Sequence, residues 1–220
     1  MILRLTAKLA QKIGLDPLPA LPYDKGRNPL LDWHAHLFTV QRTHYILATN
    51  TASLYSLVML GRGITMGRQF AQALSDGLQD FLTGQGYQPN AVMTLLSPVQ
   101  DAIFAKTTDR RVLGSMNDLI FQSKIRLGEG QQTPFAVSYY LNETPMSYLK
   151  YRSPKDLFQE LFRQGGKPSD QGQKPNNVIY LEKFKPVAQD NGPVLADYDR
   201  LQSELIRDKV REIFRAHPRD

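Results

Sequence analysis

The chain has 220 residues and no cysteine, which excludes disulfide bonds and thiolate chemistry. A net charge of +6, from 27 Lys and Arg against 21 Asp and Glu, makes nucleic acid a reasonable partner. The basic residues are not concentrated, because residues 1–150 hold 14 Lys and Arg with 10 Asp and Glu, and residues 151–220 hold 13 with 11. No apolar run approaches the roughly 18 residues that suggest a membrane span. The first residues also lack the apolar region of a signal peptide. We therefore expect a cytoplasmic protein with no membrane partner.

The first half of the chain predicts a helix, a sheet and a second helix. Residues 2–13 carry apolar side chains at helical spacing and predict a helix, which the proline-rich segment 15–31 follows. Residues 33–40 and 44–49 flank the hairpin-length connection Gln41-Arg42-Thr43, and residues 53–60 predict a third strand. We interpret the three strands as an antiparallel meander. Residues 66–83 return to helical periodicity.

The second half predicts more helices and a separate C-terminal appendage. A strand at 102–106 leads into a helix that begins after Thr107-Thr108-Asp109, and residues 135–141 look β-like from Val137 and two tyrosines. Ser153-Pro154 predicts the start of a helix that runs to about residue 163. We expect one α+β domain over residues 1–164, with helices packed on the antiparallel sheet. Residues 165–177 predict a flexible linker, and residues 178–220 a strand at 178–184 and an amphipathic helix at 194–216. That helix either docks on its own domain or binds a protein partner, including a second copy.

The helix after Thr107 has two unlike faces. One is apolar, and the other carries Arg110, Gly114 and Asn117 in a stripe, with Asp118 and Arg111 beside it. A glycine in the middle of a helix costs roughly 1 kcal/mol relative to alanine, so it needs a reason. Gly114 would allow a ligand or another backbone to approach closely, or it would allow tight packing of the helix on the sheet, which is the interpretation we favour. Asp109 is placed to cap the helix.

Two histidines are candidate metal ligands. His34 and His36 lie two residues apart on a predicted strand, so both imidazoles point to one face, and His44 is the local candidate for a third ligand. We favour a structural pair beside Trp33. No nucleotide-binding, zinc or hydrolase motif is present, so the sequence predicts no cofactor and no metal.

The sequence Lys106-Thr-Thr-Asp-Arg-Arg-Val-Leu-Gly-Ser-Met-Asn-Asp118 resembles the T-x-D-R-x-V-L-G-x-M-N-D helix motif of an uncharacterised bacterial and archaeal family, a domain of unknown function. The resemblance extends over about residues 1–150 and includes the start Met-Ile-Leu-Arg-Leu-Thr, the strand that begins at Trp33 and the turn that contains Arg42. It implies that Arg42 and the motif residues matter to the fold or to a site, and it assigns no activity.

Two functions are open from the sequence. The first is a non-catalytic module that binds nucleic acid or a protein partner through the Arg42 turn and the Arg110/Asn117 stripe, with Arg111 and Asp118. The alternative is a metal-assisted hydrolase or nuclease that uses Asp109, Asp118 and Glu143. We favour the binding module and leave open whether the protein is an enzyme.

Overall fold

The structure is a computed structural model that describes residues 1–24, 26–128 and 132–165. Within these ranges the strands are β1 Ile2–Leu5, β2 Asp32–Val40, β3 Thr43–Asn50, β4 Ser56–Leu60 and β5 Ile103–Lys106. The helices are α1 Ala7–Lys12, α2 Gly67–Gly84, α3 Pro89–Leu96, α4 Arg110–Gly128, α5 Pro134–Glu143 and α6 Pro154–Arg163. The predicted linker (apart from its first residue, Gly165), strand 178–184 and helix 194–216 lie outside the described residues.

All five strands belong to one mixed sheet with the order β4-β3-β2-β1-β5. β2, β3 and β4 pair antiparallel, whereas β1 is parallel to both β2 and β5. The α+β class is therefore confirmed, but the purely antiparallel sheet that we predicted is wrong. Parallel neighbours need a crossover connection. Here α1 and the following segment connect β1 to β2, and β5 returns to the other side of β1 only after α2 and α3.

β1 corrects the predicted helix at residues 2–13, of which only Ala7–Lys12 is α-helical. All four residues of β1 are buried, because the strand lies between two others and helices cover both faces of the sheet. Such a strand lacks the apolar–polar alternation by which a half-exposed strand is recognised. The spacing of Ile2, Leu5, Leu9 and Ile13 therefore resembled a helix.

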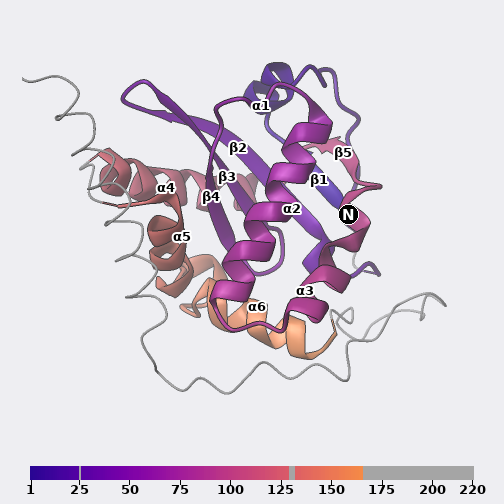
Figure 1. Cartoon of the computed structure of the whole chain (residues 1–220), viewed down its shortest axis with the longest axis vertical. Helices are drawn as coiled ribbons and strands as arrows, with labels where there is room; N and C mark the ends of the chain where they lie inside the picture. Colours follow the sequence, from indigo (N-terminus) through magenta and orange to yellow (C-terminus); the bar gives the residue numbers. More distant parts are fainter. Residues whose placement is uncertain (25, 129–131, 166–220) are drawn as a thin grey trace, which may run out of the picture. The chain divides into compact units, whose positions relative to one another are not determined.

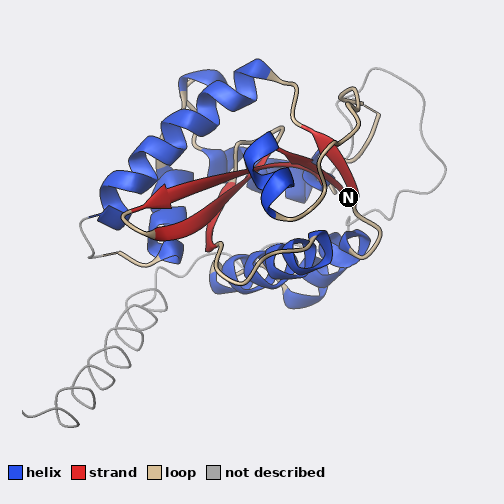
Figure 2. Cartoon of the chain, turned by 90° about the horizontal axis from the view of Figure 1, so that it is seen from above, coloured by secondary structure: helices blue, strands red, loops and turns tan. Residues whose placement is uncertain are grey.

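Helices cover both faces of the sheet and give two apolar cores (Figures 1 and 2). The first core joins α1, α2 and α3 to Leu3, Trp33 and their neighbours. The second joins α4 and α5 to Phe38, Leu47 and Val58. The α6 helix contributes Phe158 and Phe162 to the first core. Side chains of β1 and β2 thus alternate between the cores, and this alternation sets which face each polar residue meets.

The α5 helix corrects the β-like interpretation of residues 135–141. The Thr133 hydroxyl accepts a hydrogen bond from the Ala136 amide at 3.2 Å, and Pro134 occupies the first turn. Val137 and Leu141 are four residues apart and both buried, so the helix presents an apolar face to the second core. In α6 the Ser153 hydroxyl accepts from the Asp156 amide at 3.1 Å, which confirms the predicted helix start.

Candidate functional site

The polar stripe predicted on the helix after Thr107 lies on the surface. Arg110, Arg111, Gly114, Asn117 and Asp118 are all exposed on α4, whose opposite side is buried against the sheet. We call this surface, together with two apolar residues described next, the α4 face. Its exposure means that these polar side chains are not committed to the interior of the fold.

Two apolar side chains extend the α4 face beyond the predicted stripe. Phe121 is 65% exposed and Ile125 is 48% exposed. Phe121 follows Gly114 by seven residues, which places it two turns away on the same side of the helix. That spacing was available from the sequence, but the predicted stripe stopped at Asp118. Ile125 follows Phe121 by four residues, so the two exposed apolar side chains are neighbours on the helix surface.

Gly114 lies in open space. A Cβ atom built on it would meet no heavy atom within 4 Å outside its own neighbourhood. Packing of α4 on the sheet therefore does not require a glycine at this position.

Arg42 lies at the other end of α4 from Arg110. It is exposed in the two-residue turn between β2 and β3, where the neighbouring Gln41 side-chain amide donates to the carbonyl of Gly128 at 3.2 Å. At 1.5 Å per residue, about 27 Å of helix separates Arg110 from Gly128. The structure therefore does not bring the two predicted arginine sites together in one small pocket.

Asp109 and Trp33 have structural contacts. An Asp109 carboxylate oxygen accepts from the amides of Arg111 at 2.8 Å and Val112 at 3.2 Å, as an N-cap of α4 does. Trp33 is buried in the first core, and its indole nitrogen donates to the Leu30 carbonyl at 2.8 Å. Asp109 therefore stabilises the start of α4, and Trp33 packs β2 into the first core.

The carboxylates of the alternative hydrolase hypothesis are used separately. Asp109 caps α4, Asp118 points to solvent more than two turns further along, and Glu143 at the end of α5 pairs with Lys155 at 2.6 Å. Over the described ranges, no three His, Cys, Asp or Glu side chains are grouped to hold a metal ion. No observation favours a catalytic role for these three carboxylates, and we do not propose one.

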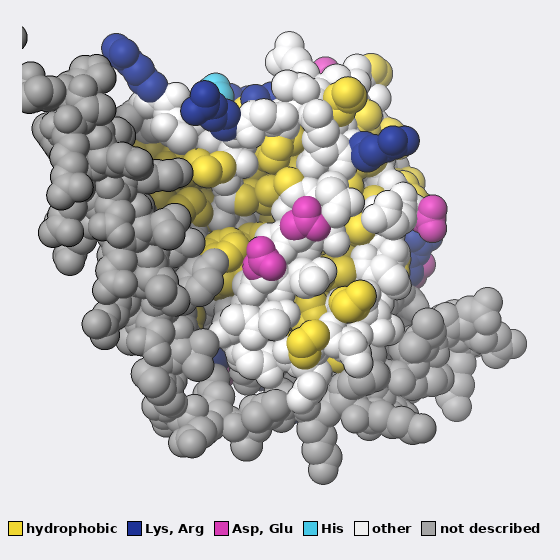
Figure 3. Space-filling model, viewed as in Figure 1, with side chains coloured by type: hydrophobic (Ala, Val, Ile, Leu, Met, Phe, Trp, Pro, Cys, Tyr) yellow, Lys and Arg dark blue, Asp and Glu magenta, His cyan; other side chains and the backbone are white. Residues whose placement is uncertain are grey.

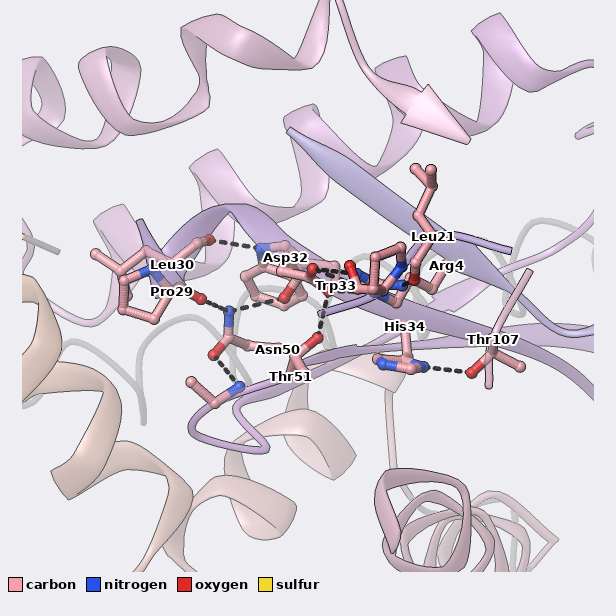
Figure 4. A network of polar contacts seen from close by, with 12 residues as sticks. Arg4, Leu21, Pro29, Leu30, Asp32, Trp33, His34, Asn50, Thr51 and Thr107 are labelled. Atoms are coloured by element: carbon pink, nitrogen blue, oxygen red, sulfur yellow. Dashed lines mark hydrogen bonds and ion pairs between the residues drawn. The ribbon is translucent and has the colours of Figure 1, made fainter. Parts of the chain in front are cut away.

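A buried polar network joins Arg4 of β1 to Asp32 of β2 (Figure 4). The Arg4 guanidinium donates to both carboxylate oxygens of Asp32, at 2.8 Å and 2.9 Å, and to the carbonyls of Leu21 and Pro22. The Thr51 hydroxyl donates to Asp32 at 2.6 Å. The side chains of Arg4 and Asp32 are only 3% and 8% exposed. Arg4 was expected on a helix, so the sequence did not predict this pair.

His34 belongs to the same region. Its Nδ1 is hydrogen-bonded to the hydroxyl of Thr107, at the end of β5, while its Nε2 is buried without a described partner. Burial lowers the pKa of His34 from 6.5 to about 4; Asp32 and Asp109 raise it slightly, and Arg4 lowers it. His34 is therefore a neutral imidazole at physiological pH. His36 lies two residues away on the same side of β2, but His44 pairs with Thr39 on the hairpin and does not complete a metal site.

The burial of neutral His34 predicts a pH-dependent stability. The pKa of His34 in the folded protein lies below the unfolded value of 6.5. The part of the stability that depends on neutral His34 is therefore fully present above about pH 6.5. As the pH falls toward 4, the unfolded chain takes up a proton that the folded chain does not. The free energy of unfolding should then fall by up to about 3 kcal/mol, from a shift of 6.5 to about 4.

Urea unfolding at closely spaced pH values measures this loss, and His34→Gln should flatten the profile between pH 4 and 6.5. An equal slope in the wild type and in His34→Gln would contradict the prediction.

On the side of the sheet that carries α2, the described Lys and Arg side chains that can be seen do not form one continuous patch (Figure 3). In the view of Figure 3, which looks onto α2, acidic side chains lie near the centre and Lys and Arg side chains lie toward the rim. The positive charge of the chain is thus not gathered on this side. Over the described residues, no helix is both long enough and apolar enough to cross a membrane.

These features define an α+β domain in which helices cover both faces of a mixed sheet. One of these helices, α4, has an exposed surface of mixed charge. A family model described as a domain of unknown function (DUF6933) matches residues 2–157, so the chain belongs to that family. The predicted resemblance to a family of unknown function is confirmed. Searches of curated proteins and of solved structures gave no match.

Proposed function

We propose that the protein is a non-catalytic binding module that binds a protein partner through the α4 face. The observation that carries the proposal is the 65% exposure of Phe121 on a face that also contains an unpacked glycine. Aromatic residues and arginine are enriched at protein interfaces, and the α4 face carries Phe121 with Arg110 and Arg111 about three turns away at the start of the helix.

The charges favour a protein partner over nucleic acid. Asp118 lies on the same face as Arg110 and Arg111, and a carboxylate there would repel a phosphate backbone. The chemistry of a fitting partner is an apolar contact for Phe121 and Ile125 with a carboxylate opposite the arginines. Arg42, beside the C-terminal end of α4, would contact the same partner at the rim.

Gly114 supports close approach of the partner. In the free protein the glycine costs roughly 1 kcal/mol of helix stability, and no contact in the described chain requires it. A partner backbone or side chain that packs directly on α4 would use the space that a Cβ atom fills. Gly114→Ala should therefore raise the free energy of unfolding by roughly 1 kcal/mol while weakening binding.

The test uses a photo-crosslinking residue, benzoylphenylalanine, placed at position 121 in cells. The control places it at Met93, which is 58% exposed on α3. We expect a protein to crosslink at position 121 and not at 93. The affinity of that purified protein should fall more than about 30-fold in Phe121→Ala, as for an interface hot spot, and stay unchanged in Met93→Ala.

Other outcomes would overturn the proposal. Crosslinking only to RNA or DNA, with salt-dependent retention that Arg110→Ala and Arg111→Ala weaken, would assign the surface to nucleic acid. Equal affinity of Phe121→Ala and wild type would exclude the α4 face as the binding surface.

A further inference from the structure

A second, separate region lies where β1 and β5 end. β1 stops at Leu5 and β5 at Lys106, whereas the neighbouring β2 continues to Val40. After β1 the chain forms α1, which packs in the first core, and after β5 it forms α4, which packs in the second. Adjacent parallel strands that send their connections to opposite faces form a topological switch point at their carboxyl ends, where α/β proteins commonly bind ligands. We call this region the β1/β5 switch point.

Two polar atoms on the β2 side of this switch point are buried without a partner among the described residues. They are the hydroxyl oxygen of Thr6 and the Nδ1 of His36. Leu5 pairs with Ala35, and the Thr6 amide donates to the Ala35 carbonyl at 3.1 Å, so Thr6 lies beside His36 on the neighbouring strand. Leu5 and Ala35 face the first core, and the extended backbone at Thr6 continues the alternation. Thr6 and His36 therefore both face the α4 side.

Two lysines bring positive charge to the same place. Lys8, at the start of α1, and Lys124, on α4, both lower the pKa of His36, in addition to the larger effect of its burial. They therefore lie close enough to act on the imidazole from two different elements. Both lysines are exposed, and neither forms an ion pair with a described residue. No described carboxylate is among the charges that act on His36.

We propose that the β1/β5 switch point binds a doubly charged oxyanion, namely the phosphate group of a small molecule. Lys8 and Lys124 supply the compensating charge, the Thr6 hydroxyl donates to one oxygen, and an N–H of His36 donates to another. An oxyanion there would satisfy two polar atoms that are otherwise buried without a bond. The ligand is a small molecule because the two donor atoms, on Thr6 and His36, are buried and do not lie on an open surface that a polymer could follow.

The test measures binding of inorganic phosphate and sulfate to the full chain by NMR of the histidine side chains at constant ionic strength. We expect both dianions to shift the His36 resonances saturably and to leave those of exposed His44 in place. Sulfate keeps its charge across the titration, so it should raise the pKa of His36, because an anion favours the imidazolium. Reciprocally, sulfate should bind more tightly as the pH falls through that pKa.

The matched variants are Lys8→Met and Lys124→Met, which remove the charge from exposed side chains. Each should weaken sulfate binding roughly tenfold, whereas Phe121→Ala on the α4 face should leave it unchanged. Circular dichroism confirms that each variant is folded. The proposal is overturned if neither anion shifts the His36 resonances more than sodium chloride does, or if both lysine variants bind sulfate as the wild type does. These results are independent of the crosslinking result for the α4 face.

Discussion

Asp32→Ala is expected to lower the free energy of unfolding by about 3–5 kcal/mol, because it leaves the Arg4 guanidinium buried and without its counter-ion. The side chain of Arg4 is 3% exposed, and two of its hydrogen bonds to Asp32 measure 2.8 Å and 2.9 Å. The Thr51 hydroxyl also loses its acceptor. Single domains are stable by only about 5–15 kcal/mol, so this loss is a large part of the total. Urea unfolding followed by circular dichroism measures it.

The control for Asp32→Ala is a second aspartate–arginine pair on the surface. Asp24 and Arg27 are 3.3 Å apart, and both side chains are 56% exposed. Asp24→Ala should cost less than about 1 kcal/mol, because water screens the exposed pair. A double variant, Arg4→Met with Asp32→Leu, should recover most of the stability, since an apolar pair of similar volume needs no counter-ion. Equal losses in Asp32→Ala and Asp24→Ala would contradict the role assigned to burial.

The buried Arg4–Asp32 pair could not be predicted from local sequence patterns. Arg4 and Asp32 are 28 residues apart, and they meet only because β1 pairs parallel with β2. Nothing local in the sequence specifies that pairing. The short buried β1 carries apolar residues at a spacing that a helix also produces, so the strand and its ion pair were missed together. The unpartnered buried atoms of Thr6 and His36 come together through the same β1–β2 pairing, so the sequence could not predict them either.

Features set by local periodicity were predictable. The exposure of Arg110, Gly114 and Asn117 follows from the 3.6-residue repeat of α4, whose apolar side the sheet covers. The start of α6 at Ser153-Pro154 follows from capping chemistry. Thr133-Pro134 carries the same signal for α5, and the β propensity of the tyrosines that follow was given too much weight. Capping residues were thus a better guide than propensity in this chain.

The second large effect concerns the aromatic cluster that attaches α6 to the first core. Phe158 is fully buried and stacks on Tyr55 with ring centroids 4.2 Å apart. The Phe158 ring also makes edge-to-face contacts with Trp33 and Tyr87, with ring centroids 6.3 Å and 6.2 Å apart. Phe158→Ala would leave a cavity between rings that belong to separate elements, which cannot easily move together to fill it. We expect it to lower the free energy of unfolding by about 3–5 kcal/mol.

Phe121→Ala is the matched control, because it removes the same atoms from a side chain that is 65% exposed. It should change stability by no more than about 0.5 kcal/mol. Trp33 is the single tryptophan of the sequence and touches Phe158, so its fluorescence reports directly on this cluster. Phe158→Ala should alter that fluorescence in the native state, and Phe121→Ala should not. If the two variants unfolded at the same urea concentration, α6 would not be held by this cluster. The pair of variants also separates the two roles of phenylalanine here, since only Phe121→Ala should weaken partner binding while leaving stability unchanged.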